Sequence, residues 1–375
     1  MKRTAVIMAG GSGERFWPLS RINKPKQLLA LLSNKTMLEE AIDRVSGYIK
    51  LEDIFIITSK ILLEPIRVTL PYLPPENVVA EPYKRNTAPC LALASAFISS
   101  RYINDFPPSD ISVAVLTADH IIEPKEAFVK TIEEAFNYVE NNKVLATIGI
   151  PPTKPHTGFG YIEINEPFSK DTNKCEIQKV VHFLEKPNYE KALEFFNKGN
   201  YLWNSGMFFW RLDTFNENLI KAYPDIGNKI AVMQNLYANQ TRVALSSSFE
   251  PIDDIFEQMP DISIDYALME KAKDVVVAKA LFNWDDVGSL DSLQGKLPTD
   301  EHNNISRGQN ILVDTKNCIV INSIENKKML FAGLGLNDFI VVLTDDAVLV
   351  CPKDKVQDIK KCILEIKNQG LTEWL

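Results

Sequence analysis

The chain has 375 residues, a hydrophobic content of 45% and a formal net charge of −8. This length suffices for one large domain and a smaller one. The acidic balance argues against nucleic-acid binding, which relies on basic surfaces. No apolar run approaches the length of about 20 residues that a membrane span needs, and residues 1–9 are too short for a secretory signal. The five cysteines lack C-x-x-C spacing, which favours reduced thiols in a cytoplasmic protein over disulfides or a zinc site.

A glycine-rich loop follows the first predicted strand. Residues 4–9 are apolar and rich in β-branched side chains, as in a buried strand. Gly10, Gly11 and Gly13 come next, and such glycines let a loop turn its backbone N–H groups toward an anion. Four cations follow within residues 15–26, and the only acid of the loop is Glu14. The sequence therefore predicts a polyphosphate site at this loop.

Two known phosphate-binding patterns do not fit this loop. The Walker pattern ends in Gly-Lys-Ser/Thr, which residues 13–17 lack. The dinucleotide pattern G-x-G-x-x-G matches two of the glycines but has Phe16 at the position of the third. Both patterns open directly into a helix, whereas Pro18 and Pro25 disfavour a long helix here.

Strands and helices alternate through the first 150 residues. This alternation predicts an α/β fold with a mostly parallel sheet covered by helices on both faces. Because ligands bind at the carboxyl ends of such strands, we expect the glycine loop, residues 81–89 and Asp119 to converge. A capping box over residues 36–39 marks one helix start. Strands are expected at 4–9, 54–58, 78–80, 112–116 and 144–150, and helices at 36–47, 61–70, 89–100 and 125–140.

The remainder of the chain changes character twice. Residues 151–294 mix strands and helices. We place the domain boundary after residue 294, which gives domains 1–294 and 295–375. Beyond residue 295, short strands at a spacing of roughly eight to eleven residues predict a small β-rich unit. An amphipathic helix over 353–368 closes it. Before the boundary we expect strands at 161–164, 177–185, 207–210 and 275–280, helices at 189–198, 212–240 and 251–272, and a turn at 203–206; after it, strands at 310–313, 318–321, 329–332, 339–343 and 347–350.

The glycine loop, G-G-S-G-E-R-F-W-P-L-S-R-x-x-x-P-K-Q-L, resembles the signature of nucleotidyltransferases that make nucleotide sugars. Further blocks stand in the order seen in the mannose-1-phosphate guanylyltransferase family. The likeness is strong over residues 3–290, and departs at Thr117, where Pro is common, and at Leu290, where Trp is frequent. The blocks are E-P-x-x-R-N-T-A-P (81–89), which favours the guanylyl branch, A-D-H (118–120), G-F-G-Y-I (158–162), F-L-E-K-P (183–187), W-N-S-G-M-F (203–208) and W-D-D-V-G-S (284–289).

This resemblance implies a Rossmann-like, mostly parallel mixed sheet, followed by a small β-rich domain for which a left-handed β-helix is one form. It also implies transfer of GMP from GTP to mannose 1-phosphate, with release of pyrophosphate. The attacking phosphate is largely ionised at neutral pH, since its second pKa is about 6, so no general base is required. Catalysis must then consist of positioning and charge neutralisation. Arg15 is expected to hold the β- and γ-phosphates, and Lys26 to lie nearer the α-phosphate. The nucleotide contacts implied are Ala9, Gly10, Gly11, Ser12, Gly13, Glu14, Arg85, Asn86 and Thr87.

The resemblance also implies a metal site and a sugar site. Asp119 and Asp286 are the expected Mg²⁺ ligands, because Mg²⁺ takes one or two carboxylates together with phosphates and water. Spacing alone leaves a helix cap or a turn acid equally open for both. A solvated surface charge is likewise open for Arg21 and Lys24. The sugar phosphate is expected to contact Gly160, Glu185, Lys186 and Asn204.

Three alternatives stay open at this stage. The same chemistry could use another nucleotide or another hexose 1-phosphate. A non-catalytic subunit that senses nucleotide sugars is disfavoured, because Arg15, Lys26, Asp119 and Asp286 are all present. A nicotinamide oxidoreductase is disfavoured by the missing third glycine. The partners expected are GTP and mannose 1-phosphate, with a homodimer as one assembly.

Overall fold

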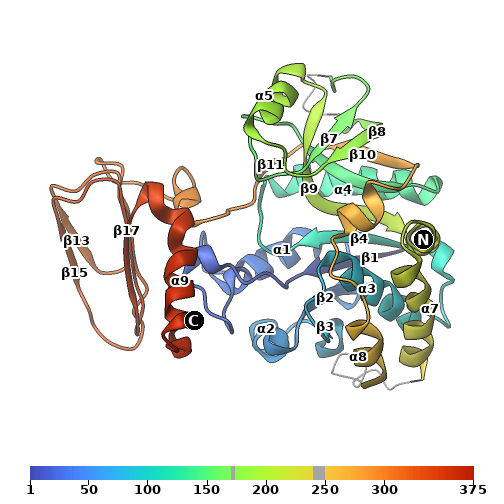
Figure 1. Ribbon diagram of the computed structural model, residues 1–375, viewed down its shortest axis with the longest axis horizontal. Coiled ribbons are helices and arrows are strands. Elements are labelled where there is room, and N and C mark those ends of the chain that lie inside the picture. Colours follow the sequence, from blue (N-terminus) through green and yellow to red (C-terminus); the bar gives the residue numbers. More distant parts are fainter. Residues whose placement is uncertain (170–173, 240–249) are drawn as a thin grey trace. The chain divides into compact units, whose positions relative to one another are not determined.

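The computed structural model describes residues 1–169, 174–239 and 250–375 (Figure 1). These residues form two compact units that each draw on several stretches of the chain. The first unit comprises Met1–Gly10, Ala41–Ala118 and Ile122–Trp284. The second comprises Gly11–Glu40, Asp119–Ile121 and Asp285–Leu375. The glycine loop thus belongs mostly to the second unit, together with the C-terminal residues. The boundary at residue 295 stays a prediction.

The first unit is built on a nine-stranded sheet among the described residues, in the order β3-β2-β1-β4-β9-β6-β10-β8-β7. Strands β1 to β4 pair in parallel, as does β6 with β10. Strand β9 runs antiparallel to both β4 and β6. The α/β class is therefore confirmed, and the sheet is mixed. Its strands are β1 Lys2–Met8, β2 Ile54–Ser59, β3 Val78–Glu81, β4 Ile111–Thr117, β6 Leu145–Ile150, β7 Tyr161–Ile164, β8 Ile177–Leu184, β9 Tyr201–Arg211 and β10 Val275–Lys279.

Helices cover the sheet of the first unit on both faces. Side chains alternate between the two faces of a strand, and β9 shows this with three buried aromatics. Phe208 and Trp210 join the core formed with helices α3, α6, α7 and α8. Phe209 faces the other way and meets Phe136 of α4 edge-on, with ring centroids 5.4 Å apart. The helices are α1 Met37–Val45, α2 Leu63–Thr69, α3 Thr87–Arg101, α4 Lys125–Asn141, α5 Tyr189–Lys198, α6 Leu212–Ala222, α7 Pro224–Ala238 and α8 Glu250–Glu257 (Figure 1).

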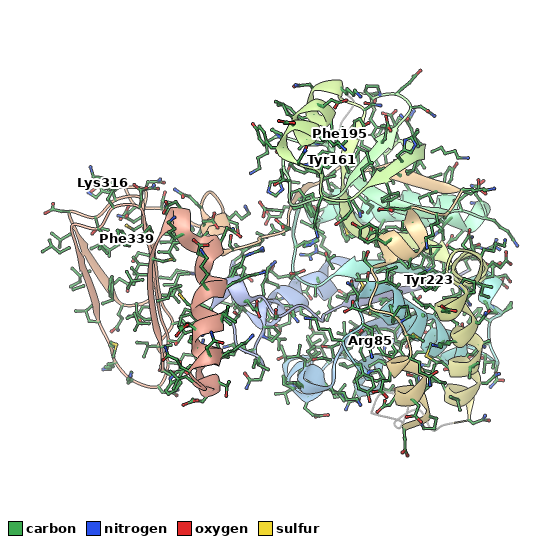
Figure 2. The ribbon with its side chains drawn as sticks, viewed as in Figure 1. Arg85, Tyr161, Phe195, Tyr223, Lys316 and Phe339 are labelled. Atoms are coloured by element: carbon green, nitrogen blue, oxygen red, sulfur yellow. The ribbon has the colours of Figure 1, made fainter. Side chains whose placement is uncertain are left out.

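Strands β7, β8 and β9 form a subassembly with α5. Tyr161 of β7 packs against Phe195 of α5, with ring centroids 5.3 Å apart (Figure 2). The prediction of a turn at residues 203–206 is wrong, because β9 continues through them. Its hydrogen bonds to β6 and β7 hold the segment extended. Gly206 adopts a φ of +70°, so a local irregularity is accommodated within β9 and the strand continues.

The predicted helix over 251–272 is broken in the structure. Helix α8 ends at Glu257, and a separate π-helical turn, Asp265–Met269, follows. Residue 240, the last of the predicted helix 212–240, lies outside the described residues. Within the described part of the chain, no helix is long and apolar enough to cross a membrane.

The second unit stacks short strands in register. Ile305 pairs with Ile319, which pairs with Ile340, in a parallel ladder that buries these side chains. Strand β17 closes the ladder antiparallel to β16, and α9, Ile359–Asn368, follows a short 3₁₀ segment. The predicted β-rich unit is confirmed, with one strand, β12, that the prediction missed. The strands are β12 Ile305–Arg307, β13 Asn310–Val313, β14 Ile319–Asn322, β15 Phe331–Leu334, β16 Phe339–Leu343 and β17 Val348–Pro352. Two three-residue strands, β5 Ile121–Glu123 and β11 Asn283–Asp285, complete the set among the described residues.

The loop that follows the glycines is anchored in this second core. Phe16 and Trp17 are buried with apolar residues of the stacked strands and of α9. The indole N–H of Trp17 donates to the carbonyl of Trp374 at 2.7 Å. The aromatic pair therefore fixes the loop, so that the charged residues on either side of it are held in place.

Candidate functional site

Gly13 permits a close approach that no other residue would allow. Its φ is +60°, and a Cβ added there would lie 2.4 Å from the Cβ of Lys26. Its carbonyl accepts hydrogen bonds from the N–H of Phe16 and the hydroxyl of Ser20, at 2.9 and 2.8 Å. The glycine thus brings residues 11–16 against residue 26, which joins the two ends of the predicted phosphate loop.

The glycine loop has hydrogen-bond donors that have no acceptor among the described residues. The backbone N–H groups of Gly11, Ser12 and Gly13 donate no hydrogen bond to another described residue. The Nε of Arg15 is buried and likewise has no partner among them. Buried donors without acceptors are costly, so this arrangement suits an anionic ligand. Glu14 turns toward Lys367 of α9, with a carboxylate-to-ammonium distance of 3.7 Å.

Lys26 joins the two acidic residues that the sequence singled out. Its Nζ lies 3.0 Å from Oδ2 of Asp119 and donates to the backbone carbonyl of Asp286 at 2.6 Å. The lysine is only 5% exposed. Burial alone would raise the pKa of Asp119, but the charge of Lys26, with help from His120, lowers it below its ordinary value. Asp119 is therefore ionised at neutral pH. We call Gly13, Arg15, Lys26, Asp119 and Asp286 the Lys26 cluster.

The structure separates the roles of Asp285 and Asp286. Asp285 accepts from the N–H of Val287 at 2.7 Å and pairs with the ammonium of Lys296 at 2.7 Å. Val287 is held at φ +45°, a conformation that a β-branched residue adopts only under constraint. Asp285 thus builds the turn, and its neighbour Asp286 lines a cleft. This agrees with the choice of Asp286 as the metal ligand, which stays a prediction.

The Lys26 cluster lines a cleft of about 270 Å³. No group of three or more His, Cys, Asp or Glu side chains in the described ranges could cage a metal alone. Two carboxylates beside a phosphate-sized cleft do match Mg²⁺, which keeps most of its sites for water and substrate phosphates. The donor set therefore fits the expected cation. The cleft is lined by Ser12, Gly13, Glu14, Arg15, Phe16, Lys26, Asp119, His120, Asp286, Gly288 and Lys360.

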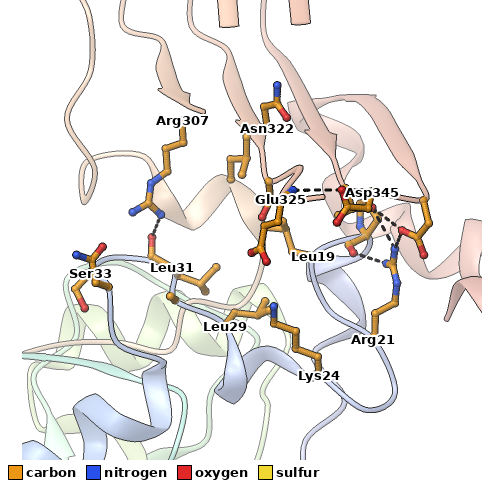
Figure 3. Close-up of a pocket in the computed structure, with 17 residues that line it drawn as sticks. Leu19, Arg21, Lys24, Leu29, Leu31, Ser33, Arg307, Asn322, Glu325 and Asp345 are labelled. Atoms are coloured by element: carbon orange, nitrogen blue, oxygen red, sulfur yellow. Dashed lines mark hydrogen bonds and ion pairs between the residues drawn. The ribbon is translucent and has the colours of Figure 1, made fainter. Parts of the chain in front are cut away.

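A larger cleft of about 590 Å³ lies elsewhere in the second unit (Figure 3). It receives Arg21 and Lys24, the two cations whose role was open. Arg21 pairs with Asp346 at 2.7 Å, and Arg307 donates to the carbonyl of Leu31. Three cations and three acids line this cleft, so it lacks the concentrated positive charge of a polyphosphate site. Arg21 thus forms a structural ion pair with Asp346.

A second cluster of predicted residues lies in the first unit. Gly160 is buried, and a Cβ there would lie 2.6 Å from Oε2 of Glu185. Lys186 is held at φ +41°, and its ammonium lies 3.3 Å from Oε1 of Glu185. The backbone N–H of Asn204 donates to the carbonyl of Gly160 at 2.8 Å. All four residues predicted to contact the sugar phosphate are therefore close together.

Asp265 belongs to this group, and sequence reasoning missed it. Its Oδ1 accepts from the side-chain amide of Asn204 at 2.8 Å, whose own Oδ1 accepts from the N–H of Gly206 at 3.1 Å. Burial, followed by the nearby charge of Glu185, raises the pKa of Asp265. The sequence did offer one indication of Asp265, namely a single acid within a largely apolar run. A buried acid usually has a charged partner or a functional role. We call Gly160, Glu185, Lys186, Asn204 and Asp265 the Asn204 cluster.

The three predicted nucleotide residues at α3 take part in local structure. Asn86, at φ +64°, caps the helix by accepting from the N–H of Thr87 at 2.9 Å. The hydroxyl of Thr87 accepts from the N–H of Ile264 at 2.8 Å. Arg85 donates to the carbonyl of Glu257 at 2.7 Å, while its buried Nε has no partner among the described residues. Their nucleotide contacts stay predictions, as do those of Ala9 and Gly10 at the end of β1.

Two family models match the chain and cover nearly all of it. The nucleotidyl transferase model matches residues 4–302. The model of the mannose-P isomerase/GMP-like β-helix domain matches residues 308–366. The first match contains both clusters, and the second covers most of the stacked strands.

Similar proteins include enzymes of one named activity. The chain is 38% identical over 376 residues to a mannose-1-phosphate guanylyltransferase of Salmonella montevideo, covering 99% of this chain and 75% of that protein. The corresponding enzyme of Escherichia coli K12 is 38% identical, with 98% and 74% covered. This chain thus spans about three-quarters of the length of these relatives.

Solved structures give the same assignment for the fold. A Thermus thermophilus protein described as mannose-1-phosphate geranyltransferase superposes with a TM-score of 0.81 at 29% identity, covering 98% of this chain and 100% of that one. A Helicobacter pylori protein described as mannose-6-phosphate isomerase, with a TM-score of 0.56 and 23% identity over 76% of this chain and 100% of that one, shares the fold alone. From these matches the chain belongs to the nucleotidyl transferase family, in the branch that contains the mannose-1-phosphate guanylyltransferases.

Proposed function

We propose that this chain transfers GMP from GTP to α-D-mannose 1-phosphate and releases pyrophosphate. An oxygen of the sugar phosphate forms a bond to the α-phosphorus of GTP, and the bond from that phosphorus to the bridging oxygen of the β-phosphate breaks. The products are GDP-mannose and pyrophosphate. The nucleophile arrives ionised, since its second pKa is about 6, so the protein need not remove a proton.

The Lys26 cluster is the observation that carries this proposal. The buried Lys26, Arg15 with its unpartnered Nε, and the loop residues Ser12 and Gly13 line one cleft of about 270 Å³. Two unit charges 4 Å apart interact with about 1 kcal/mol in water and about 4 kcal/mol near a protein surface. Repulsion between two phosphates is therefore the main barrier, and fixed cations lower it. We assign the β- and γ-phosphates to Arg15 and the α-phosphate to Lys26.

We assign Mg²⁺ to the carboxylates of Asp119 and Asp286. When bound, the cation supplies further charge neutralisation for the triphosphate. Lys26 holds Asp119 through one carboxylate oxygen and Asp286 through its backbone carbonyl. The lysine thus orients both residues, and it contacts Asp286 through the main-chain carbonyl.

We assign the sugar 1-phosphate to the Asn204 cluster. Glu185 offers carboxylate oxygens to sugar hydroxyls, and Lys186, which is exposed, offers its ammonium to the phosphate. Asn204 is fixed through its main chain and through both ends of its side-chain amide. A site with fixed donors and acceptors rejects a sugar that leaves them unpaired. The cytoplasmic location and the homodimer stay predictions.

Pyrophosphate release tests the proposal directly. The purified protein is incubated with Mg²⁺, mannose 1-phosphate and one nucleoside triphosphate at a time, namely GTP, ATP, UTP or dTTP. We expect release with GTP well above the other three. Release that is fastest with ATP or dTTP would assign the same chemistry to another nucleotide. Glucose 1-phosphate in place of mannose 1-phosphate checks the sugar in the same way. Absence of release with every pair would leave the non-catalytic sensing subunit.

A further inference from the structure

Lys360 lines the cleft of the Lys26 cluster, yet it comes from a different part of the chain than that cluster does. It is the second residue of α9, within the stretch that matches the β-helix domain model, whereas the nucleotidyl transferase model matches only residues 4–302. The residue is exposed, and no hydrogen bond or ion pair joins it to another described residue. The mechanism proposed above gives this ammonium no role.

The position of Lys360 in its helix is electrostatically unfavourable. The N-terminal turn of a helix carries a partial positive charge, so a cation placed there is disfavoured. The first turn of α9 contains no acid, and Asp358, which precedes it, pairs with Lys361 at 2.9 Å. Lys360 is therefore an unbalanced cation at the positive end of a helix. An anion bound in the cleft would balance this charge.

Helix α9 packs along the part of the glycine loop that carries Arg15. It contacts the 3₁₀ turn Glu14–Phe16, and the ammonium of Lys367 lies 3.7 Å from the carboxylate of Glu14. Lys360 precedes Lys367 by seven residues, which is about two helical turns, so both lysines lie on the same side of the helix. Lys360 and Arg15 thus reach the cleft from two elements that are packed against each other.

We propose that Lys360, together with Arg15, binds the β- and γ-phosphates of GTP and the pyrophosphate that these two phosphates become. This inference rests on the proposed function, which supplies the triphosphate and assigns the same two phosphates to Arg15. An ammonium forms strong, charge-assisted hydrogen bonds to phosphate oxygens. Here it neutralises the negative charge that collects on the leaving pyrophosphate. The C-terminal helix thereby supplies a group that touches the reacting substrate.

The two directions of the reaction separate this role from a general effect on the site. GTP and pyrophosphate both contain the phosphates assigned to Lys360, whereas GDP-mannose contains only the α-phosphate of GTP and the sugar phosphate. The KM values for GTP and mannose 1-phosphate are measured in the forward direction, and those for pyrophosphate and GDP-mannose in the reverse direction. The proteins compared are the wild type, Lys360→Met and Lys360→Arg, all with Mg²⁺.

We expect Lys360→Met to raise the KM for GTP and for pyrophosphate about 10-fold, as the loss of one hydrogen bond to a charged group implies. The KM values for GDP-mannose and mannose 1-phosphate should stay at the wild-type level. Lys360→Arg keeps the cation and should recover most of the loss. The matched control is Lys361→Met, which alters the adjacent lysine, whose side chain is 78% exposed and paired with Asp358. It should keep all four wild-type KM values.

An unchanged KM for pyrophosphate in Lys360→Met overturns the inference. An equal rise in the KM for GDP-mannose overturns it as well, because it would mark a disturbance of the whole site. If the wild type turns over no substrate in either direction, the proposed function fails. Equilibrium binding of inorganic pyrophosphate to the wild type and to Lys360→Met then tests the inference by itself, and equal affinities of the two proteins would refute it.

Discussion

Asp119 and Asp265 are both partly buried carboxylates in predicted substrate sites, yet their pKa values move in opposite directions. In the Lys26 cluster, a buried ammonium lies 3.0 Å from Asp119 and lowers the pKa of this carboxyl against the effect of burial. In the Asn204 cluster, burial and the neighbouring Glu185 raise the pKa of Asp265, whose hydrogen-bond donor is the neutral amide of Asn204. The first arrangement keeps its acid ionised, whereas the second resists ionisation.

The contrast follows from what each cluster would bind. A triphosphate and a cation need charges that persist in the absence of ligand, which a preformed ion pair secures. Neutral sugar hydroxyls need acceptors of defined direction, and net charge matters less for them. A carboxylate pair with a fixed amide provides that direction at some cost in stability. Substitutions at Lys26, Asp286 and Asp265 test whether the two clusters differ in this way.

The largest effect should come from Lys26→Met. The variant removes a cation from the reacting phosphates and leaves Asp119 without its partner. We expect kcat/KM for GTP to fall about 100–1,000-fold, the loss usual for a preorganised charge-stabilising group. Steady-state pyrophosphate release measures it. Lys24→Met is the control, because Lys24 is exposed and lines the other cleft. A comparable loss in Lys24→Met would contradict a specific role of Lys26 at the reacting phosphates.

The next effect should come from Asp286→Asn. Loss of one carboxylate should raise the Mg²⁺ concentration for half-maximal rate about 10–100-fold, because a hard cation depends on ionised oxygen ligands. Asp285→Asn is the matched control. Its amide oxygen can still accept from Val287, and the ion pair it loses, to Lys296, is partly exposed and worth at most about 1 kcal/mol. Equal Mg²⁺ dependence in the two variants would contradict the assignment of Asp286.

The smallest effect concerns stability and pH at Asp265. Its folded-state pKa is raised above the ordinary value, so the folded protein binds more protons than the unfolded chain over the interval between the two values. Its contribution to the free energy of unfolding therefore decreases as the pH rises from about 4 through the raised folded pKa. Asp265→Asn removes this titration. Urea unfolding of both proteins at several pH values should show the wild type losing stability relative to the variant as the pH rises. A constant difference would argue that Asp265 has an ordinary pKa.

Several local features could be predicted because neighbouring residues fix them. The capping box at Thr36 and Glu39 forms as expected, with mutual hydrogen bonds of 2.8 and 3.2 Å. The buried strand before the glycines and the alternation through residue 150 follow from hydrophobic period alone. The turn expected at residues 203–206 failed, because hydrogen bonds from β6 and β7 override the local preference of Asn, Ser and Gly.

The candidate site residues also differ in whether the sequence alone could predict them. Arg15, Lys26, Asp119 and Asp286 could be predicted as site residues, because each stands beside a glycine loop or a strand end in a recognisable order of motifs. Asp265 carries no such mark in the sequence. It reaches Asn204 only because a π-helical turn, Asp265–Met269, returns the chain to β9. The pairing of Asp285 with Val287 and Lys296, which separates it from Asp286, is likewise a matter of three-dimensional contacts.

By itself the sequence determined the fold class, the family and the chemical types present at the site, because these depend on period, composition and the order of motifs. The tertiary structure decided which charges meet. It buried Lys26 between Asp119 and the carbonyl of Asp286 and paired Arg21 with Asp346. Burial and Coulomb energy depend on distance and on dielectric surroundings, which only the folded chain defines.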